Sequence, residues 1–390
     1  MPQTPYFVCD AQALARNLEV VDRIRTEAGC KVLFATKCFA MDPILRRIYA
    51  HTDGVVTSGA YEARHARELL GEDSYVVSYS AGFTEADFDD FAACSTHVVF
   101  NSWSQVARYR GRLTGHRAGV RVNPGLAAGS VPGHHGSLSD YARPHSRLGI
   151  HPDELSVEAV LEHAIDGLLF HANSRNADFE RLESMLNRFE ALYAEVLALP
   201  QIRWLSLGGG ISFTEPGYPV EALCRLLRQL AERLQVEILL EPGHAVISRP
   251  FSLVAQVVDV LEREPRVVVL DTSAEAHLPD VLLYPHEVRR IPGGIAQKGT
   301  DPKRYAEAGG HEHILTGLTC LAGDVFGTYR FQRPLQVGDR VTFLDAGDYS
   351  MVKNSFFNGI RKPDVYLEHA DGSLERVRAY GYEDYLTHVS

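Results

Sequence analysis

The sequence predicts an α/β chain, in which a (β/α)8 barrel of the TIM type is followed by a C-terminal, mostly antiparallel β domain. Between residues 30 and 243, eight short apolar runs alternate with amphipathic stretches. Near-continuous apolar runs are typical of parallel strands buried on both faces, and eight such units close a barrel. After residue 245 the apolar residues alternate in period two, which indicates antiparallel strands. An open, doubly wound sheet is the main alternative, but no GxGxxG follows the first run.

Each expected barrel strand ends in small or polar residues. The eight runs occupy residues 30–38, 54–59, 74–80, 96–102, 118–125, 166–174, 202–210 and 236–243. Between them, apolar residues spaced by three and four predict helices, as in PVEALCRLLRQLAERLQ. The stretch from Asn123 to Gly149 is too long and glycine-rich for an ordinary barrel loop, so we expect it to be a functional loop.

We expect the barrel to span residues 11–245 and the β domain to comprise residues 246–390 together with residues 1–10. The opening run PYFVCD precedes the first barrel helix and predicts a strand that pairs with the second domain. The period-two segments after the barrel are SLVAQVVDVLE, PRVVVLDTS, DRVTFLDAG and the final ERVRAYGYEDY.

The composition is that of an ordinary globular protein, with 390 residues, of which 45% are hydrophobic and 23% charged. Its 50 acidic residues outnumber the 39 basic ones, and a net charge of -11 argues against a general nucleic-acid binder. The six cysteines form no CxxC pair, which favours reduced thiols in a cytoplasm. The chain starts without a signal-peptide pattern, and no apolar run approaches the roughly 18 residues that a membrane span needs. We therefore expect a cytoplasmic protein that does not enter the membrane.

Residues able to do chemistry follow several of these runs, where a barrel places its active site. Lys37 ends the first run, and burial in a barrel mouth would make its amine a nucleophile. Gly208, Gly209 and Gly210 end the seventh run and could approach a phosphate, although three glycines also serve as a tight turn. Glu241 ends the eighth run, opposite Lys37, and could hold a pyridinium nitrogen or form a plain salt bridge. Together these residue types suit pyridoxal phosphate.

Other polar residues follow the fifth and sixth runs. His171 could stack on a flat cofactor and Ser174 could reach its phosphate, or the histidine could be structural. Arg121, Asn123 and Arg147 could bind an anionic group or pair with surface acids. Histidines also occur as HH at 134–135 and as HEH at 311–313, but this spacing is a poor metal signature, so we expect no metal.

With these residues in place, the chain resembles the alanine-racemase-fold (fold type III) decarboxylases that use pyridoxal phosphate. ATKCFA resembles the segment of the cofactor-binding lysine, LGGG the phosphate loop and LEPG the glutamate that pairs with the pyridine nitrogen. VVVLDTSAEAHLPDVL, TCLAGDVFG and YSMVKNSFFNGI resemble the carboxynorspermidine and carboxyspermidine branch more than ornithine decarboxylase. The resemblance extends over nearly the whole chain.

The resemblance implies a role for each matching residue. Lys37 would bind pyridoxal phosphate covalently, His171 would stack on the ring, and Glu241 would pair with the pyridine nitrogen. Further expected cofactor contacts are Ser174, Gly209, Gly210, Gly243 and Tyr349. In a homodimer with shared active sites, Cys320 would return a proton to the substrate carbon from the second subunit. The expected substrate-binding residues are Arg147, His277 and Asp324, the last near the substrate's amine.

Four segments depart from the family pattern, and all fall where substrate or phosphate would bind. The sixth run continues as HANSRNADF without a Cys-Glu pair, the glycine loop continues as ISFTEPG without two histidines, LLYPHEVRRIPGG replaces a proline-tyrosine segment, and His244 replaces an arginine.

We expect a pyridoxal-phosphate-dependent decarboxylase of an amino acid with an amine-bearing chain, with carboxynorspermidine or carboxyspermidine as the leading substrate, in polyamine biosynthesis. The alternatives are a specialised metabolite with an aminocarboxypropyl-type group, such as a siderophore, antibiotic or modified-peptide precursor, and an amino-acid racemase of the same fold.

Overall fold

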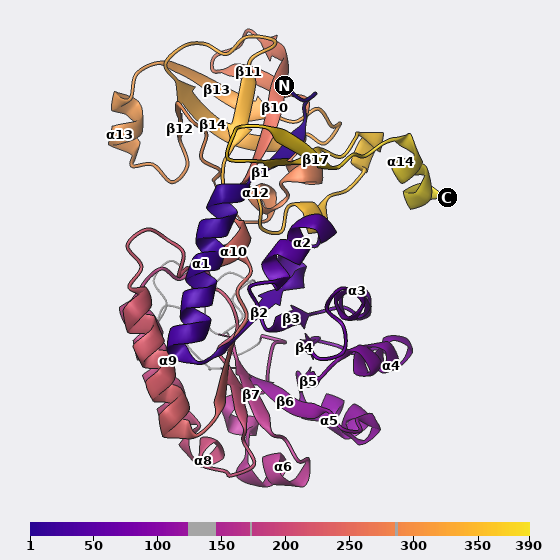
Figure 1. Cartoon of the computed structure of the whole chain (residues 1–390). Coiled ribbons are helices and arrows are strands. Elements are labelled where there is room, and N and C mark those ends of the chain that lie inside the picture. The colour runs from indigo at the N-terminus through magenta and orange to yellow at the C-terminus, as the bar shows by residue number, and fades with distance from the viewer. Residues whose placement is uncertain (124–145, 172–173, 285–287) are drawn as a thin grey trace. The chain divides into compact units, whose positions relative to one another are not determined.

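The structure, a computed structural model, describes residues 1–123, 146–171, 174–284 and 288–390 (Figure 1). Most of the expected functional loop, including the histidines at 134–135, lies outside the described residues. The chain divides into two compact units. We call residues 17–37 and 41–246 the barrel unit, and residues 1–16, 38–40 and 247–390 the sheet unit. The division differs from the expected one at residues 11–16 and 38–40, which join the sheet unit, and at Val246, which joins the barrel unit.

Eight parallel strands form a closed barrel, one in each of the eight apolar runs, which confirms the predicted fold class. In chain order they are β2 (Lys31–Ala35), β3 (Gly54–Thr57), β4 (Tyr75–Tyr79), β5 (His97–Phe100), β6 (Arg117–Val122), β7 (Gly167–Phe170), β8 (Trp204–Ser206) and β9 (Glu237–Leu240). The barrel closes where β2 pairs with β9, with Lys31 opposite Leu239. All carboxyl ends therefore meet at one rim.

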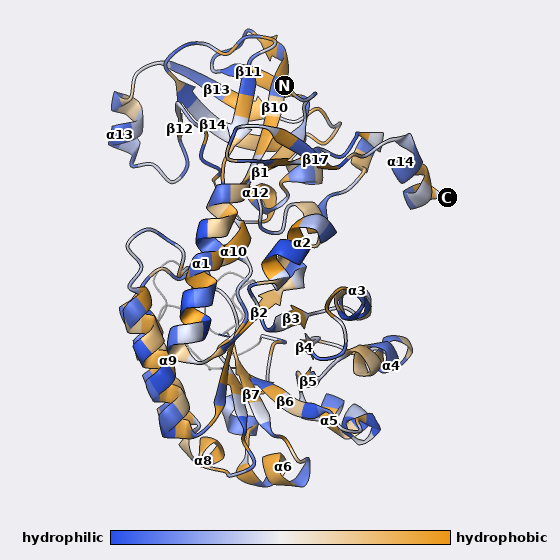
Figure 2. Ribbon diagram, viewed as in Figure 1, coloured by the Kyte–Doolittle hydropathy of each residue, from blue (hydrophilic) through white to orange (hydrophobic). Residues whose placement is uncertain are grey.

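Helices alternate with the barrel strands along the chain. They are α1 (Ala11–Ala28), α2 (Asp42–Tyr49), α3 (Ala60–Leu70), α4 (Glu85–Cys94), α5 (Trp103–Tyr109), α6 (Val157–Glu162), α7 (Phe179–Leu192), α8 (Ala194–Leu197), α9 (Val220–Leu234) and α10 (His244–Ile247). In α9, the residues Leu223, Leu227 and Leu230 recur at helical spacing and are buried. Figure 2 shows hydrophilic and hydrophobic residues alternating along this helix.

A cluster of aromatic residues fills the amino-terminal end of the barrel. Trp204 is 1% exposed and occupies the space left by two glycines, because a Cβ at Gly167 would lie 1.8 Å from its ring and one at Gly119 would lie 2.4 Å away. The Trp204 indole N–H donates to Asp166 at 3.0 Å. The ring of His97 packs edge-on against Trp204 at 5.3 Å. This end is therefore occupied by packed side chains, and the chemistry falls to the carboxyl ends.

The described residues of the sheet unit form a nine-stranded sheet. Its strands are β1 (Tyr6–Asp10), β10 (Phe251–Leu261), β11 (Arg266–Leu270), β12 (Gly294–Ala296), β13 (His311–Thr316), β14 (Val325–Phe331), β15 (Arg340–Phe343), β16 (Asp364–Glu368) and β17 (Leu374–Arg378). The N-terminal β1 pairs antiparallel with β10 and parallel with β16, so the opening run does join the second domain. Three short helices, α11 (Ala274–His277), α12 (Asp280–Leu283) and α13 (Pro302–Glu307), lie between strands in sequence.

The end of the chain differs from the prediction. The alternating segment ERVRAYGYEDY predicted a single strand, but β17 ends at Arg378 and α14 (Tyr382–Val389) follows. The Gly381 N–H donates to the Asp384 carboxylate at 2.8 Å, and this contact begins the helix. A local cap thus prevails over the alternating pattern.

None of the described helices is long and apolar enough to span a bilayer.

We expect His97 to make the stability of the barrel depend on pH. Burial lowers its pKa to about 4, whereas the unfolded chain has a histidine pKa of about 6.5. The unfolded state therefore binds the proton first as the pH falls, and stability is lost between pH 6.5 and about 4. From pH 7 to pH 5 the loss from this residue is roughly 2 kcal/mol. Urea unfolding should show a smaller loss in His97→Asn than in the wild type.

The control is His311→Asn, which replaces an exposed histidine of β13, outside the barrel. A His97→Asn protein as acid-sensitive as the wild type would contradict the prediction.

Candidate active site

Lys37 and Glu241 come together at the carboxyl rim of the barrel. Lys37 lies in a 3-10 turn (Thr36–Cys38) directly after β2, and Glu241 directly follows β9. Because β2 and β9 are neighbours, the two residues come from adjacent strands and not from opposite sides of the mouth, as the sequence had suggested. The Ala35 N–H donates to the Pro242 carbonyl at 3.0 Å and fixes the two strand ends together. The charge of Lys37 favours the ionised form of Glu241.

Glu241 is a buried carboxyl group held by one hydroxyl. It is 6% exposed, and its Oε1 accepts a hydrogen bond from Ser206 Oγ at 2.5 Å. The Ser206 oxygen in turn accepts from the Gly208 N–H at 3.1 Å. Burial raises the pKa of Glu241 above its usual value, while Ser206, Lys37 and Arg121 act in the opposite direction. The ionised form of a carboxylate in this setting is stabilised most by a cationic group that binds in the mouth of the barrel.

The turn after β8 can be built only from glycine. Gly208 has φ +65, and a Cβ there would lie 2.3 Å from His171 Nδ1. At Gly209 a Cβ would lie 2.4 Å from the Glu241 carbonyl oxygen. Gly210 has φ +86, which is also the region that favours glycine. The backbone of this turn therefore lies directly against the ends of β7 and β9.

His171 follows β7 and is oriented by this turn. The Gly209 N–H donates to His171 Nδ1 at 3.0 Å, so a neutral ring carries its proton on Nε2. Burial lowers the pKa of His171 well below its usual value, and repulsion from Arg121 and Lys37 adds to this effect. The ring is thus neutral at physiological pH. The Gly209 N–H, which was expected to bind a phosphate, donates a hydrogen bond to His171 here.

Three residues at the ends of β4, β5 and β6 complete the rim, and the sequence singled out only one of them. Arg121 is 6% exposed, and its guanidinium lies 4.9 Å from the centre of the Tyr79 ring. The Tyr79 hydroxyl donates to Asn101 Oδ1 at 2.7 Å. Tyr79 and Asn101 both end apolar runs, which is the signal that could have identified them. Among the described residues, no carboxylate forms an ion pair with Arg121.

Asn101 also fixes the segment that carries Arg147. Its Nδ2 donates to the Arg147 carbonyl at 2.7 Å, and its Oδ1 accepts from the Gly149 N–H at 2.8 Å. The Ile150 N–H donates to the Arg121 carbonyl at 2.8 Å, so the same segment pairs with the end of β6. The backbone at Arg147 is therefore part of the barrel rim.

Two of the departures from the family pattern meet beside the glycine turn. Ser212 Oγ and His244 Nε2 lie 2.8 Å apart, which links the segment after the turn to the start of α10. The neighbouring Gly243 is buried, whereas Ser174 is exposed. Both belong to loops that follow barrel strands.

The remaining predicted site residues lie in the sheet unit. The Tyr349 N–H donates to the Cys38 carbonyl at 2.9 Å, and the residue adopts φ +57, which is rare outside glycine. Burial raises the pKa of its hydroxyl. Cys320 is exposed, and the other described cysteines are buried or partly buried. The exposure of Cys320 leaves its thiol accessible from outside the chain.

Asp324 and His277 are both buried within the sheet unit. Asp324 is 2% exposed, and its carboxylate accepts four hydrogen bonds from the chain itself. His277 is fully buried, with Nδ1 2.8 Å from the Thr272 hydroxyl, and burial lowers its pKa to about 3. The position of neither side chain supports the predicted direct contact with a substrate.

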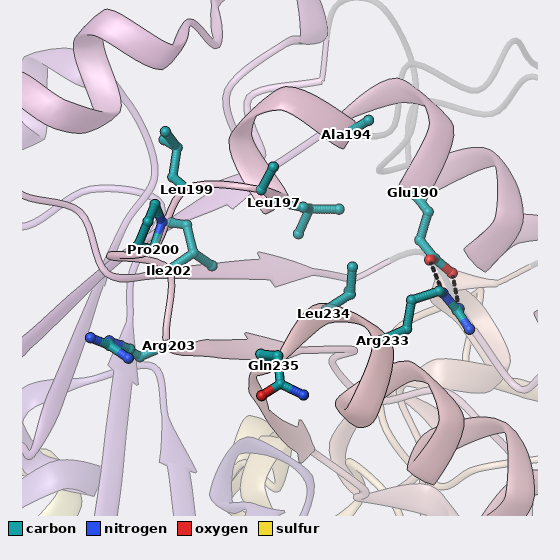
Figure 3. Close-up of a pocket in the computed structure, with 11 residues that line it drawn as sticks. Glu190, Ala194, Leu197, Leu199, Pro200, Ile202, Arg203, Arg233, Leu234 and Gln235 are labelled. Carbon is teal, nitrogen blue, oxygen red and sulfur yellow. Dashed lines mark hydrogen bonds and ion pairs between the residues drawn. The ribbon is translucent and has the colours of Figure 1, made fainter.

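A separate cavity of about 560 Å³ lies at the other end of the barrel, where β8 and β9 begin (Figure 3). Leu197, Ile202 and Leu234 supply apolar walls. Arg233 pairs with Glu190 at 2.6 Å on one side of it. This end of a barrel contributes to stability, so we do not associate the cavity with the reaction.

Comparison with known proteins places the chain in a family. The model of the pyridoxal-dependent decarboxylases with their C-terminal sheet domain matches residues 7–347. A carboxynorspermidine/carboxyspermidine decarboxylase of Herminiimonas arsenicoxydans is 38% identical, with the whole of both chains covered. A carboxyaminopropylagmatine decarboxylase of a Synechocystis species is 34% identical over 98% of this chain and 94% of its own.

A solved structure agrees with this relationship. The carboxynorspermidine decarboxylase of Campylobacter jejuni, determined in complex with norspermidine, is 33% identical and superposes with a TM-score of 0.84 over 99% of this chain and 100% of its own. The closed barrel agrees with the family match over residues 7–347. The rim that holds Lys37, Glu241 and the glycine turn agrees with it as well. The chain belongs to the pyridoxal-phosphate-dependent decarboxylases.

Proposed function

We propose that the enzyme decarboxylates carboxynorspermidine or carboxyspermidine and so forms a polyamine. The observation that carries the chemistry is the buried Glu241 beside Lys37 at a rim closed by a glycine turn. The choice of substrate is supported by the 38% and 34% identical relatives that bear this name. All six cysteines are reduced thiols, which agrees with action in a reducing cytoplasm.

The residues of the rim fit pyridoxal phosphate. The Lys37 amine is the nucleophile that would bind the cofactor's carbonyl carbon, and Glu241 would hold a proton on the pyridine nitrogen. His171 offers a neutral ring face, and Gly210 lies in the turn that would approach the phosphate, together with Ser174, Gly243 and Tyr349. When bound, the cofactor accepts the electron pair left on the substrate carbon as carbon dioxide departs. The task of Glu241 is to stabilise that charge through the ring nitrogen.

Arg147 is proposed to bind an anionic group of the substrate. Asn101 fixes its backbone at the rim through hydrogen bonds to the residue itself and to Gly149. An arginine held in this way can present a planar pair of donors to a carboxylate. The buried Arg121, 4.9 Å from the centre of the Tyr79 ring, adds positive charge at the same rim.

Cys320 is proposed to return the proton to the carbon that has lost carbon dioxide. A thiol can give up a proton near neutral pH, after which solvent restores it. Leu318 and Leu321, which flank this cysteine, are each 42% exposed, and the nearby Phe357 is 38% exposed. Exposed apolar side chains around a reactive group support a homodimer in which this surface is covered and the active sites are shared.

We expect the purified enzyme to carry bound pyridoxal phosphate with a visible absorption band that Lys37→Ala lacks, because the Lys37 amine is the attachment point. Borohydride treatment followed by peptide mass spectrometry should find the cofactor on Lys37 alone. Carbon dioxide release should be fastest with carboxynorspermidine or carboxyspermidine and at least about tenfold slower with diaminopimelate or ornithine.

Carboxyaminopropylagmatine belongs in the same assay, because a relative of 34% identity is named for it. Preference for that compound would overturn the proposed substrate and keep the reaction. A protein that carries no cofactor on Lys37 would overturn the reaction as well.

We expect Ser206→Ala to weaken the cofactor site without unfolding the barrel. Loss of the hydroxyl removes a hydrogen bond that lowers the pKa of Glu241, so this pKa rises further. Glu241 is then protonated at higher pH, and the acid limb of kcat/KM moves up by as much as about one pH unit. Cofactor affinity should fall about tenfold, as for loss of a hydrogen bond to a charged group.

The matched control is Ser78→Ala. This serine is equally buried in the barrel but bonds to Thr57 and Ser95, not to Glu241. Equal shifts of the acid limb in both variants would show that general damage to the barrel is the cause.

We expect Leu321→Asp to dissociate the homodimer and to abolish most activity, because a charge would be buried where two copies meet. Light scattering after gel filtration gives the mass, and the activity should fall with it. The control is Val337→Asp, since Val337 is 64% exposed in the same unit and lies away from Cys320 in sequence. A fully active, dimeric Leu321→Asp protein would contradict the shared-site arrangement.

A further inference from the structure

The loop that carries Cys320 is folded around the side chain of Asp324. We call residues 317–324, which connect β13 to β14, the cysteine loop. The Gly317 N–H donates to the Asp324 carbonyl at 2.8 Å, and the Asp324 N–H donates to the Leu321 carbonyl at 2.9 Å. The two ends of the loop are thus joined through the backbone, with Cys320 between them.

The carboxylate of Asp324 is fully occupied. Its Oδ1 accepts from the Ala274 N–H at 2.7 Å and from the Glu275 N–H at 3.3 Å. Its Oδ2 accepts from the Thr319 hydroxyl at 2.6 Å and from the Thr319 N–H at 3.2 Å. A carboxylate has about four acceptor sites, so this group has none left for a substrate amine. It joins the cysteine loop to the first residues of α11.

The backbone of the cysteine loop packs closely around this carboxylate. A Cβ at Gly317 would lie 2.1 Å from Asp324 Oδ2, so the backbone of the loop lies directly on the carboxylate. Thr319, which donates twice, immediately precedes Cys320. The Cys320 N–H itself donates to Asn358 Oδ1 at 2.7 Å. The backbone on the amino side of the thiol is therefore held by two separate side chains.

We propose that Asp324 is the positioning residue for Cys320, acting through Thr319 and not through contact with the substrate. The inference rests on the proposed function, in which the Cys320 thiol gives its proton to the substrate carbon, becomes a thiolate and regains a proton from solvent. A proton donor must lie within hydrogen-bond reach of the accepting carbon, so a loop that shifts by an ångström slows this step. Substrate affinity would change little.

The first test is a double-mutant cycle with Asp324→Asn and Cys320→Ala. In asparagine an NH2 group replaces one carboxylate oxygen, so two of the hydrogen-bond acceptor sites become donors. The loop then cannot keep its hydrogen bonds and its shape. We expect Asp324→Asn to lower kcat about tenfold or more, with KM within about threefold of the wild type. If Asp324 acts only through the thiol, the double variant should have the same kcat as Cys320→Ala.

The second test needs no turnover and follows the alkylation of Cys320 by iodoacetamide, peptide by peptide, with mass spectrometry. We expect the labelling rate of Cys320 to change about threefold or more in Asp324→Asn, because access to the thiol depends on the loop. The partly buried Cys94 of α4 is the internal reference and should not change. Asp301→Asn, which removes an equivalent cap from α13, is the matched control.

The outcomes separate this proposal from the function on which it rests. A Cys320→Ala enzyme with full activity would overturn the role of the thiol as the acid. An impaired Cys320→Ala enzyme on which Asp324→Asn imposes a further, independent loss would overturn the positioning role alone. Unchanged Cys320 labelling in Asp324→Asn would overturn it as well.

Discussion

The active-site rim depends on the close approach of the glycine turn after β8 to the ends of its two neighbours. The Glu241 N–H donates to the Gly208 carbonyl at 2.9 Å, and no side chain fits at Gly208 or Gly209. Two further hydrogen bonds lie beside this contact, from the Ser206 hydroxyl to Glu241 and from the Gly209 N–H to His171 Nδ1. Any larger residue would push His171 and Glu241 away from the turn, because the atoms it would meet are ring or backbone atoms of these two residues.

The electrostatics of the rim follow from that packing. Glu241 is buried, and burial alone would favour its neutral form, yet Ser206, Lys37 and Arg121 all favour the carboxylate. Burial keeps His171 neutral, and repulsion from the same two cations adds to this effect. One carboxylate, one neutral ring and one amine are what a pyridine cofactor needs from a protein: a partner for its nitrogen, a face and a nucleophile. Opposed influences of this kind are typical of functional sites and cost stability in the free protein.

The sequence predicts those parts of the molecule that depend on local pattern. Each barrel strand is a short run of buried residues, and Lys37 and Glu241 directly follow such runs, so position along the chain was enough to find them. The partnerships of Asp324 could not be found in this way, because Ala274 lies 50 residues earlier and only folding brings it close. Tyr79 and Asn101 end apolar runs and could have been singled out by position, but the hydrogen bond between them joins two strands and could not be predicted. At the C-terminus the alternating pattern continues beyond Gly381, but the hydrogen bond from the Gly381 N–H to Asp384 begins a helix there.

The segment after the long loop is fixed to the barrel at its rim. Leu148 packs against the barrel core from the side of the mouth, while Asn101 holds the backbone on both sides of it, at Arg147 and Gly149. Gly149 adopts φ +90 and lies so close to β6 that a Cβ would be 2.9 Å from the Asn123 nitrogen. The backbone at Arg147 therefore cannot shift far without disturbing Leu148, which packs against the core. A rim residue whose backbone is tied to the core in this way is held precisely, because the barrel itself resists its displacement.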